Sequence, residues 1–212
     1  MKYFQLIDKL NSGEIILKKD DGYFYRYSFG KNIWIKTAMM TNYHWADSHL
    51  YGLFEQIPED KAIDLLSQRR SMFEKLYELA LQISQKAHEG QFDKGGNDYI
   101  QHPLRVADSL DDLEQKIVAL LHDVIEDSKI SIDQLINYGF TNRIVNSIKI
   151  LTKSPKISYD DYIRAVKKDN SAWRVKIADI KDNLDISRIP NPTDADYERI
   201  EKYRAALNFL ES

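Results

Sequence analysis

The chain contains, at positions 116–127, the stretch Lys116-Ile117-Val118-Ala119-Leu120-Leu121-His122-Asp123-Val124-Ile125-Glu126-Asp127. Its apolar residues recur at the spacing of a buried helix, which we predict over residues 112–127. Side chains four residues apart share one face of a helix, so His122 should lie over Glu126 and Asp123 over Asp127. The stretch therefore predicts a mostly apolar helix with an imidazole and three carboxylates on one face.

Carboxylates in such an apolar segment need a partner. Burying a carboxylate among apolar side chains costs free energy unless the group is paired or coordinates a metal ion. The cluster also lies near the predicted C-terminal end of the helix, where negative charge opposes the helix macrodipole. A divalent cation would offset both costs. The alternative is a helix whose acidic side chains face water, and the His122-Asp123 pair alone does not decide between the two.

The composition is that of a globular chain without a general affinity for polyanions. Of its 212 residues, 43% are hydrophobic and 30% are charged, which suffices for one ordinary domain and a small appendage. The net charge of −3 gives no general attraction to nucleic acid or anionic membranes, so phosphate recognition must come from local cations. We therefore expect neither a nucleic acid nor a membrane as a partner.

The lack of cysteine and of a long apolar run bears on the cellular compartment of the protein. The sequence has no cysteine, which excludes disulfides and thiol catalysis and fits a reducing compartment. No apolar run approaches the roughly 20 residues of a membrane span, and polar residues near the N-terminus interrupt any signal core. We expect a cytoplasmic protein.

Residues 1–57 favour a small antiparallel β appendage. β-branched and aromatic runs at 14–18, 23–27 and 33–35 predict strands, with Asp21-Gly22 as a hairpin signal. Further aromatic residues, which form either a ligand platform or, in the interpretation we favour, a small core, are Tyr43, Trp45, Tyr51 and Phe54. His44 and His49 are interpreted as structural or exposed.

After Pro58 the periodicity becomes helical, which predicts an all-helical domain over residues 58–212. Ser131 and Gln134 fit a capping box, and Gly139 is a stop signal. The helices that we expect span residues 59–67, 69–88, 103–109, 112–127, 131–137, 142–152, 159–168, 171–186 and 194–210. The predicted fold class is mainly α, a helical bundle with a small N-terminal antiparallel β appendage.

Two other segments supply polar groups that the 112–127 helix lacks. A glycine-bearing loop runs into His102-Pro103, and proline suits the first position of a helix, so His102 should lie at a helix mouth. Taken alone, His102 would sooner be interpreted as a capping or surface residue. Asp179 lies beside Ile177 and Ile180 on the inner side of a predicted helix, where a lone aspartate is usually a salt-bridge partner.

The order of His102, His122-Asp123 and Asp179 resembles the His…His-Asp…Asp signature of the HD superfamily of metal-dependent phosphohydrolases. The surrounding segments resemble the hydrolase domain of RelA/SpoT-type alarmone enzymes, and this likeness covers about residues 70 to 210. The segments that carry it are Ala87-His88-Glu89-Gly90-Gln91, Tyr99-Ile100-Gln101-His102-Pro103-Leu104-Arg105-Val106-Ala107, Leu120-Leu121-His122-Asp123-Val124-Ile125-Glu126-Asp127 and Lys176-Ile177-Ala178-Asp179. The resemblance implies an HD-type helical bundle.

The resemblance also implies a metal site, whose ligands are His102, His122, Asp123 and Asp179. Two imidazoles and two carboxylates suit a first-row divalent ion and leave positions open for water and a phosphate oxygen. Manganese is the ion that we expect, while iron, cobalt, nickel, zinc and magnesium stay open. By the same resemblance, Glu126 and Asp127 position or deprotonate the attacking water.

Substrate contacts follow from the same alignment. Lys94 falls where the alarmone hydrolases keep a lysine near the nucleotide, and Asn183 where they keep an asparagine facing the site; each is alternatively a solvent-facing residue. His88 is expected to support the loop that carries Lys94. The chain departs from the pattern at Asp93, where a basic residue is usual. It departs again after Asp179, where it reads Ile-Lys-Asp-Asn-Leu-Asp and the family reads Arg-Leu-His-Asn-Met.

The function predicted from these residues is hydrolysis of a nucleotide by metal-activated water, in its most concrete form removal of the 3′-diphosphate from guanosine tetraphosphate. No synthetase domain is expected within the chain, so it should only degrade alarmones. Two alternatives stay open: a nucleotidase or phosphodiesterase for another nucleotide, and a non-catalytic module that binds a nucleotide or metal. The expected partner is a small-molecule nucleotide, and the sequence leaves a homo-oligomer open.

Overall fold

The computed structural model describes residues 1–6, 16–21, 23–28, 33–37 and 54–212. The chain divides into two compact units, Met1–Glu74 and Lys75–Ser212. The long helix α2 (Glu59–Ala87) begins in the first unit and ends in the second. Within the described ranges, no helix has both the length and the apolar character that crossing a bilayer requires.

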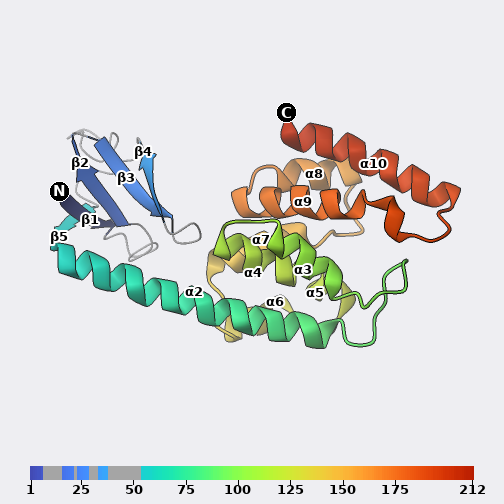
Figure 1. Cartoon of the computed structure of the whole chain (residues 1–212), viewed down its shortest axis with the longest axis horizontal. Helices are drawn as coiled ribbons and strands as arrows, with labels where there is room; N and C mark the ends of the chain where they lie inside the picture. The colour runs from blue at the N-terminus through green and yellow to red at the C-terminus, as the bar shows by residue number, and fades with distance from the viewer. Residues whose placement is uncertain (7–15, 22, 29–32, 38–53) are drawn as a thin grey trace. The chain divides into compact units, whose positions relative to one another are not determined.

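The first unit contains a five-stranded antiparallel sheet with the strand order β4-β3-β2-β1-β5 (Figure 1). Its strands are β1 (Lys2–Leu6), β2 (Ile16–Asp20), β3 (Tyr23–Ser28), β4 (Ile33–Thr37) and β5 (Phe54–Ile57). The strands predicted at 14–18, 23–27 and 33–35 correspond to β2, β3 and β4. Asp21 has a φ of 46° between β2 and β3, a left-handed conformation that aspartate tolerates in a tight turn.

Strands β1 and β5 were not predicted; they pair with each other across the 47 residues between Leu6 and Phe54. A small core forms where the beginning of α2 covers the sheet: Tyr3, Ile16 and Ile57 pack with Ala62, and Trp34, Leu65 and Leu66 lie against them. Tyr3 also donates a hydrogen bond to Glu59 Oε1 at 2.8 Å. The predictions for Tyr43, His44, Trp45, His49 and Tyr51 lie outside the described residues, and Phe54 begins β5. The proposed domain boundary falls at the end of β5.

The second unit is helical, as predicted. Its elements are α3 (Gln101–Asp108), α4 (Leu113–Leu121), α5 (Val124–Asp127), α6 (Ile132–Asn137), α7 (Asn142–Leu151), α8 (Tyr159–Val166), α9 (Asn170–Asn183), the 3₁₀ turn η1 (Ile186–Arg188) and α10 (Asp194–Glu211). The capping box of Ser131 and Gln134 is present at the start of α6. A second capping box, formed by Thr193 and Asp196, begins α10.

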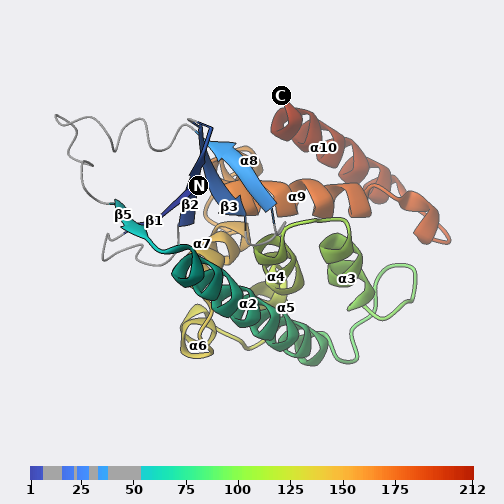
Figure 2. The same ribbon diagram turned by 60° about the vertical axis from the view of Figure 1, so that its left-hand side comes forward.

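Helix α9 is the centre of this unit. It contacts α3, α4 and α7, and also α8 and α10, so it is surrounded by helices along most of its length. Figures 1 and 2 show α9 with α4 on one side and α10 on the other in both views. Val175, Ala178 and Ile180 of α9 are buried in this arrangement. A polar side chain on an inner face of α9 is therefore held against α3 or α4.

Several predicted helix boundaries are wrong. Residues 59–67 and 69–88 form one helix, α2, because no proline or glycine interrupts them. Helix α3 begins at Gln101, so His102 lies within its first turn rather than ahead of it.

The continuous 112–127 helix is also wrong, because α4 ends at Leu121 and α5 begins at Val124. Nδ1 of His122 lies 2.7 Å from the carbonyl oxygen of Ala119, which a continuous helix would use for the amide of Asp123. The regular stacking predicted for His122 over Glu126 and for Asp123 over Asp127 therefore does not apply.

Candidate metal centre

Four side chains from three segments of the second unit meet at the inner face of α9. His102 comes from the first turn of α3, His122 and Asp123 from the break between α4 and α5, and Asp179 from α9. Nε2 of His102 lies 3.2 Å from Oδ1 of Asp179, and Nε2 of His122 lies 3.1 Å from Oδ2 of Asp123. The two remaining His–Asp separations are 3.7 and 3.8 Å. The structure thus brings together all four predicted ligands.

Three of these residues, His102, His122 and Asp179, are buried, and one ligand atom from each lies within 4.8 Å of the others, so the group could hold a metal ion. The second nitrogen of each imidazole is already engaged: Nδ1 of His102 lies 2.7 Å from Oδ2 of Asp182, and Nδ1 of His122 faces the carbonyl of Ala119. Since both partners are acceptors, each Nδ1 carries a proton, and in the neutral ring the Nε2 lone pair faces the centre. This donor set fits a divalent ion.

In the metal-free centre, the electrostatic interactions favour ionised carboxylates and protonated imidazoles. Burial raises the pKa of Asp179, but the Lys176 ammonium and the two imidazoles outweigh burial and hold that pKa well below its usual range. Burial also opposes ionisation of Asp123, yet His122 lowers its pKa to about 2. Conversely, burial lowers the pKa of both histidines, but the adjacent carboxylates outweigh it and raise both pKa values. A metal ion would therefore compete with protons here.

Lys176 and Asn183 hold Asp179 from its own helix. The Lys176 ammonium, on a side chain that is 15% exposed, donates to Oδ2 of Asp179 at 2.8 Å. Asn183 donates to Oδ1 of Asp179 at 2.6 Å and to its carbonyl oxygen at 3.1 Å. Asn183 was predicted to contact substrate, but the structure places its amide on Asp179. Sequence reasoning missed Lys176, although its spacing three residues before Asp179 on a helix was a signal.

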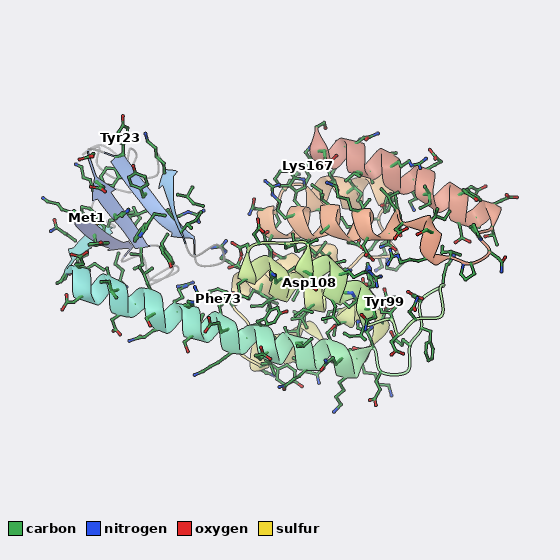
Figure 3. All side chains as sticks on the ribbon, viewed as in Figure 1. Met1, Tyr23, Phe73, Tyr99, Asp108 and Lys167 are labelled. Carbon is green, nitrogen blue, oxygen red and sulfur yellow. The ribbon has the colours of Figure 1, made fainter. Side chains whose placement is uncertain are left out.

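Tyr99 is a second missed residue. Its hydroxyl donates to Oδ2 of Asp123 at 2.8 Å, and its ring lies 5.7 Å from that of His102, just before α3 (Tyr99 is labelled in Figure 3). Burial, followed by the negative charge of Asp123, raises the pKa of Tyr99, so the phenol stays a donor. His88 packs on the other side, with its ring 4.9 Å from that of Tyr99.

The centre opens into a cavity of about 560 Å³. The residues that line the cavity also include the cations Lys153, Arg199 and Lys202 and the rings of Tyr159, Tyr162 and Tyr203. Within the part of the chain that the structure describes, neither the Lys153 nor the Lys202 ammonium is paired with a carboxylate. The Lys202 ammonium lies 3.9 Å from the ring centre of Tyr159. The cavity therefore offers positively charged side chains to an anionic ligand.

The two predicted catalytic carboxylates differ in position. Glu126 lines the cavity, and its Oε1 accepts a hydrogen bond from the Lys153 amide at 2.5 Å. Asp127 is not among the described residues that line the cavity, and its backbone carbonyl accepts from the Gln91 side chain at 3.0 Å. Burial, with the charge of Asp123 second, raises the pKa of the Asp127 carboxyl.

The loop that carries Lys94 is fixed by acidic side chains. Oδ1 of Asp93 accepts from the amides of Gly95 and Asn97, each at 2.9 Å, so this carboxylate organises the loop. Lys94 lines the cavity, but its ammonium is paired with Asp196 of α10. The hydrogen bond from Lys94 holds the pKa of Asp196 well below its usual range.

His88 also supports this loop from the end of α2, as predicted: its Nδ1 lies 2.8 Å from Oε1 of Gln91.

A helical bundle with a buried His and Asp centre beneath an open cavity is an architecture of metal-dependent domains. Residues 80–179 match the family model described as HD domain.

Several relatives share this segment. The chain is 32% identical over 117 residues to the guanosine-3′,5′-bis(diphosphate) 3′-pyrophosphohydrolase of Haemophilus influenzae, covering 48% of this chain and 17% of that protein. The Aquifex aeolicus protein of the same name is 33% identical, with 50% and 17% covered. The bifunctional (p)ppGpp synthase/hydrolase SpoT of Escherichia coli is 30% identical, with 48% and 16% covered. The chain thus spans about a sixth of the length of these curated relatives.

A solved structure shares the fold. It is described as a metazoan ortholog of SpoT that hydrolyzes ppGpp, and it matches with a TM-score of 0.54 and 20% sequence identity. The match covers 64% of this chain and 84% of the other. At this identity the likeness establishes the arrangement of the helices.

The raised pKa values of His102 and His122 predict the pH dependence of stability in the metal-free protein. A histidine whose folded-state pKa exceeds its unfolded value of about 6.5 stabilises the fold below that pH, and this contribution is lost as the pH rises through the folded pKa. We expect the Tm without metal to fall from about pH 6 to about pH 9, and the increase in Tm caused by Mn²⁺ to grow over the same range. Differential scanning calorimetry measures both, and an unchanged Tm would contradict the charge assignment.

Gly95 makes a close approach that a side chain would prevent. A Cβ at this position would meet the carbonyl oxygen of Arg188, so Gly95→Ala should push the Lys94 loop away from η1. We expect a loss of about 1–3 kcal/mol in the free energy of unfolding, measured by denaturant titration. Glu89→Ala, an exposed change in the same region, is the control and should have little effect.

Proposed function

We propose that this chain is a divalent-metal-dependent phosphohydrolase that acts on a nucleotide, most concretely by removing the 3′-diphosphate of a guanosine alarmone. The observation that carries the proposal is the convergence of two imidazoles and two carboxylates at the floor of a cavity with unpaired lysines in its wall. Nucleotides offer the phosphate charge that such a wall attracts.

In this proposal His102, His122, Asp123 and Asp179 hold the ion. Manganese is our first choice because a mixed nitrogen and oxygen donor set suits a first-row divalent ion. A bound divalent ion supplies two things, a lower pKa for water and neutralisation of charge that develops on the phosphoryl group. Lys176 and Asn183 hold Asp179, and Tyr99 holds Asp123, so the carboxylates are oriented before any ligand arrives.

Glu126 is the residue that we assign to proton transfer. It lies on the cavity wall, and the Lys153 amide occupies its Oε1, which leaves Oε2 to accept the proton of the attacking water. Water oxygen bonds to phosphorus, the bond between phosphorus and the 3′ oxygen breaks, and the leaving oxygen takes up a proton. We place Asp127 behind Glu126, where its charge supports the base.

Recognition of the substrate comes from the cationic wall. Lys153, Arg199 and Lys202 offer charge to a second phosphate group, which favours nucleotides that carry phosphates at more than one position. Lys94 joins them when a phosphate replaces Asp196 as its partner. The relatives named as guanosine-3′,5′-bis(diphosphate) 3′-pyrophosphohydrolases support the alarmone as the first substrate to test.

A second candidate is a nucleotidase or phosphodiesterase for another nucleotide. The observation that favours it is Asp93, which stands where a basic residue is usual in the alarmone hydrolases and whose carboxylate is committed to the loop backbone. The nucleotide side of the cavity therefore lacks one cation that those enzymes have.

A nucleotide panel separates these functions. The Mn²⁺-loaded protein is incubated with guanosine tetraphosphate, the corresponding 5′-diphosphate, cyclic dinucleotides and nucleoside monophosphates, and the products are separated by ion-exchange chromatography. We expect pyrophosphate from guanosine tetraphosphate. Inorganic phosphate as the main product would favour the second candidate, and metal retention without turnover of any compound would favour a binding module.

Two substitutions separate metal binding from proton transfer. Asp123→Ala should abolish metal retention and hydrolysis together, because it removes a ligand. Glu126→Gln should retain the metal and lower kcat by about 10²- to 10⁴-fold, because it removes only the proton acceptor. Metal content by elemental analysis and initial rates measure both effects, with the exposed change Glu89→Gln as control. Full activity in Glu126→Gln would show that the assigned base is wrong.

A further inference from the structure

Building on the proposed function, we propose that Asp182 is the positioning residue of His102, and that Arg105 and Arg188 hold Asp182 in place for this task. None of the three was predicted as a site residue. Asp182 stands at the position where the RelA/SpoT-type pattern has histidine, so the arrangement is a feature of this chain.

The contact with His102 is direct. Nδ1 of His102 donates to Oδ2 of Asp182 at 2.7 Å, while Nε2 of the same ring lies 3.2 Å from Asp179 at the centre. An imidazole held at Nδ1 cannot rotate about its own axis without breaking that bond, and its tautomer is fixed. His102 is 7% exposed, so water cannot readily replace the carboxylate as the acceptor.

Two guanidinium groups fix the carboxylate plane. Arg105 of α3 makes a two-pronged contact, from Nε to Oδ1 at 2.7 Å and from Nη2 to Oδ2 at 3.1 Å. Arg188 of η1 donates from Nη1 to Oδ2 at 3.0 Å and from Nη2 to the backbone carbonyl of Asp182. Paired N–H groups on both carboxylate oxygens specify orientation as well as charge. Asp182, with a side chain 13% exposed, thus has one orientation available.

The positions of Asp179 and Asp182 on α9 fix the geometry of this arrangement. Asp179 and Asp182 are three residues apart on the same helix and therefore lie on neighbouring positions of one face. One rigid helix sets both the carboxylate at the centre and the carboxylate that aims His102. Arg105 lies three residues after His102 on α3, so α3 and α9 carry every group of the contact except Arg188, which lies in η1.

The competing explanation is that Asp182 is only a structural anchor for two arginines. A structural anchor would affect folding stability but not the affinity or the ligand field of the metal. A readout at the metal and a readout at the His102 ring therefore separate the two explanations.

The first experiment is a Co²⁺ titration of the metal-free full chain, followed by visible absorption. We expect Asp182→Asn to weaken Co²⁺ binding by about 10- to 100-fold and to change the absorption bands. Asp185→Asn is the matched control, because Asp185 also pairs with Arg188, at 3.4 Å, and is an exposed carboxylate on the same side of the site. Wild-type affinity and bands in Asp182→Asn, or an equal loss in Asp185→Asn, would overturn the proposal.

Arg105→Gln is a second variant, which tests the proposal if Asp182→Asn fails to fold. It keeps Asp182 but removes the two-pronged contact, and we expect a smaller loss of Co²⁺ affinity than in Asp182→Asn, with an unchanged circular dichroism spectrum. An Arg105→Gln protein that is well folded and binds Co²⁺ more weakly than Asp182→Asn would contradict the order of contacts proposed here.

The second experiment needs no metal. In ¹⁵N-histidine-labelled protein at a pH above the pKa of His102, where the ring is neutral, His102 should carry its proton on Nδ1 in the wild type and show a mixed tautomer in Asp182→Asn, measured by long-range ¹H–¹⁵N correlation. An unchanged His102 tautomer would overturn the role of Asp182. A wild type that binds Co²⁺ without hydrolysing any nucleotide would refute the proposed hydrolase and leave this test intact, whereas a wild type without Co²⁺ affinity would refute both the metal site and the positioning role.

Discussion

The burial of one carboxylate, Asp179, is the constraint on which the second unit depends. An ionised carboxylate at 5% exposure inside a helical core is costly unless every lone pair has a partner. Its partners come from three directions: Lys176 and Asn183 from α9 itself, His102 from α3, and His122 from the end of α4. The helices α3, α4 and α9 can therefore pack together only when their polar side chains meet around this carboxylate.

The break between α4 and α5 follows from the same requirement. A continuous helix would direct His122 and Asp123 by helical geometry alone. In the structure the His122 ring instead turns to the Ala119 carbonyl, and Asp123 leaves the helix. His122 thereby reaches Asp179, and Asp123 accepts a hydrogen bond from Tyr99. The regular helical hydrogen bond is lost where the polar cluster forms. Such departures from local regularity are common at sites that bind ligands.

Sequence reasoning was most successful where the determining information is local. Helical periodicity located most helices of residues 58–212, and the Ser131 capping box was correct because it involves only residues three apart. It failed where the determining partner is distant: β1 and β5 form because they pair with each other, and neither has a strong strand signal alone. It also failed at His122, where a tertiary requirement overrides the regular pattern.

The same division holds for the site. The four central side chains were predicted because each sits in a recognisable segment, and the structure brings them together. Asp182 and Tyr99 were missed because their importance lies in which atom they touch, and no spacing in the sequence reveals a contact across 80 residues such as that of Asp182 with His102. Lys176 was missed although its spacing from Asp179 was a local signal. Lys94 and Asn183 were identified, but their observed partners, Asp196 and Asp179, were not.

The two acidic departures from the family pattern act in the same physical way. Asp93 and Asp182 add negative charge beside the cavity that we propose binds phosphates, which would weaken anion binding if the charges were free. The Asp93 carboxylate instead accepts hydrogen bonds from the amides of its own loop. The Asp182 carboxylate accepts them from His102 and two arginines. Each carboxylate is thereby converted from a repulsive charge into a structural support, and the lysines that line the cavity remain available to an anionic ligand.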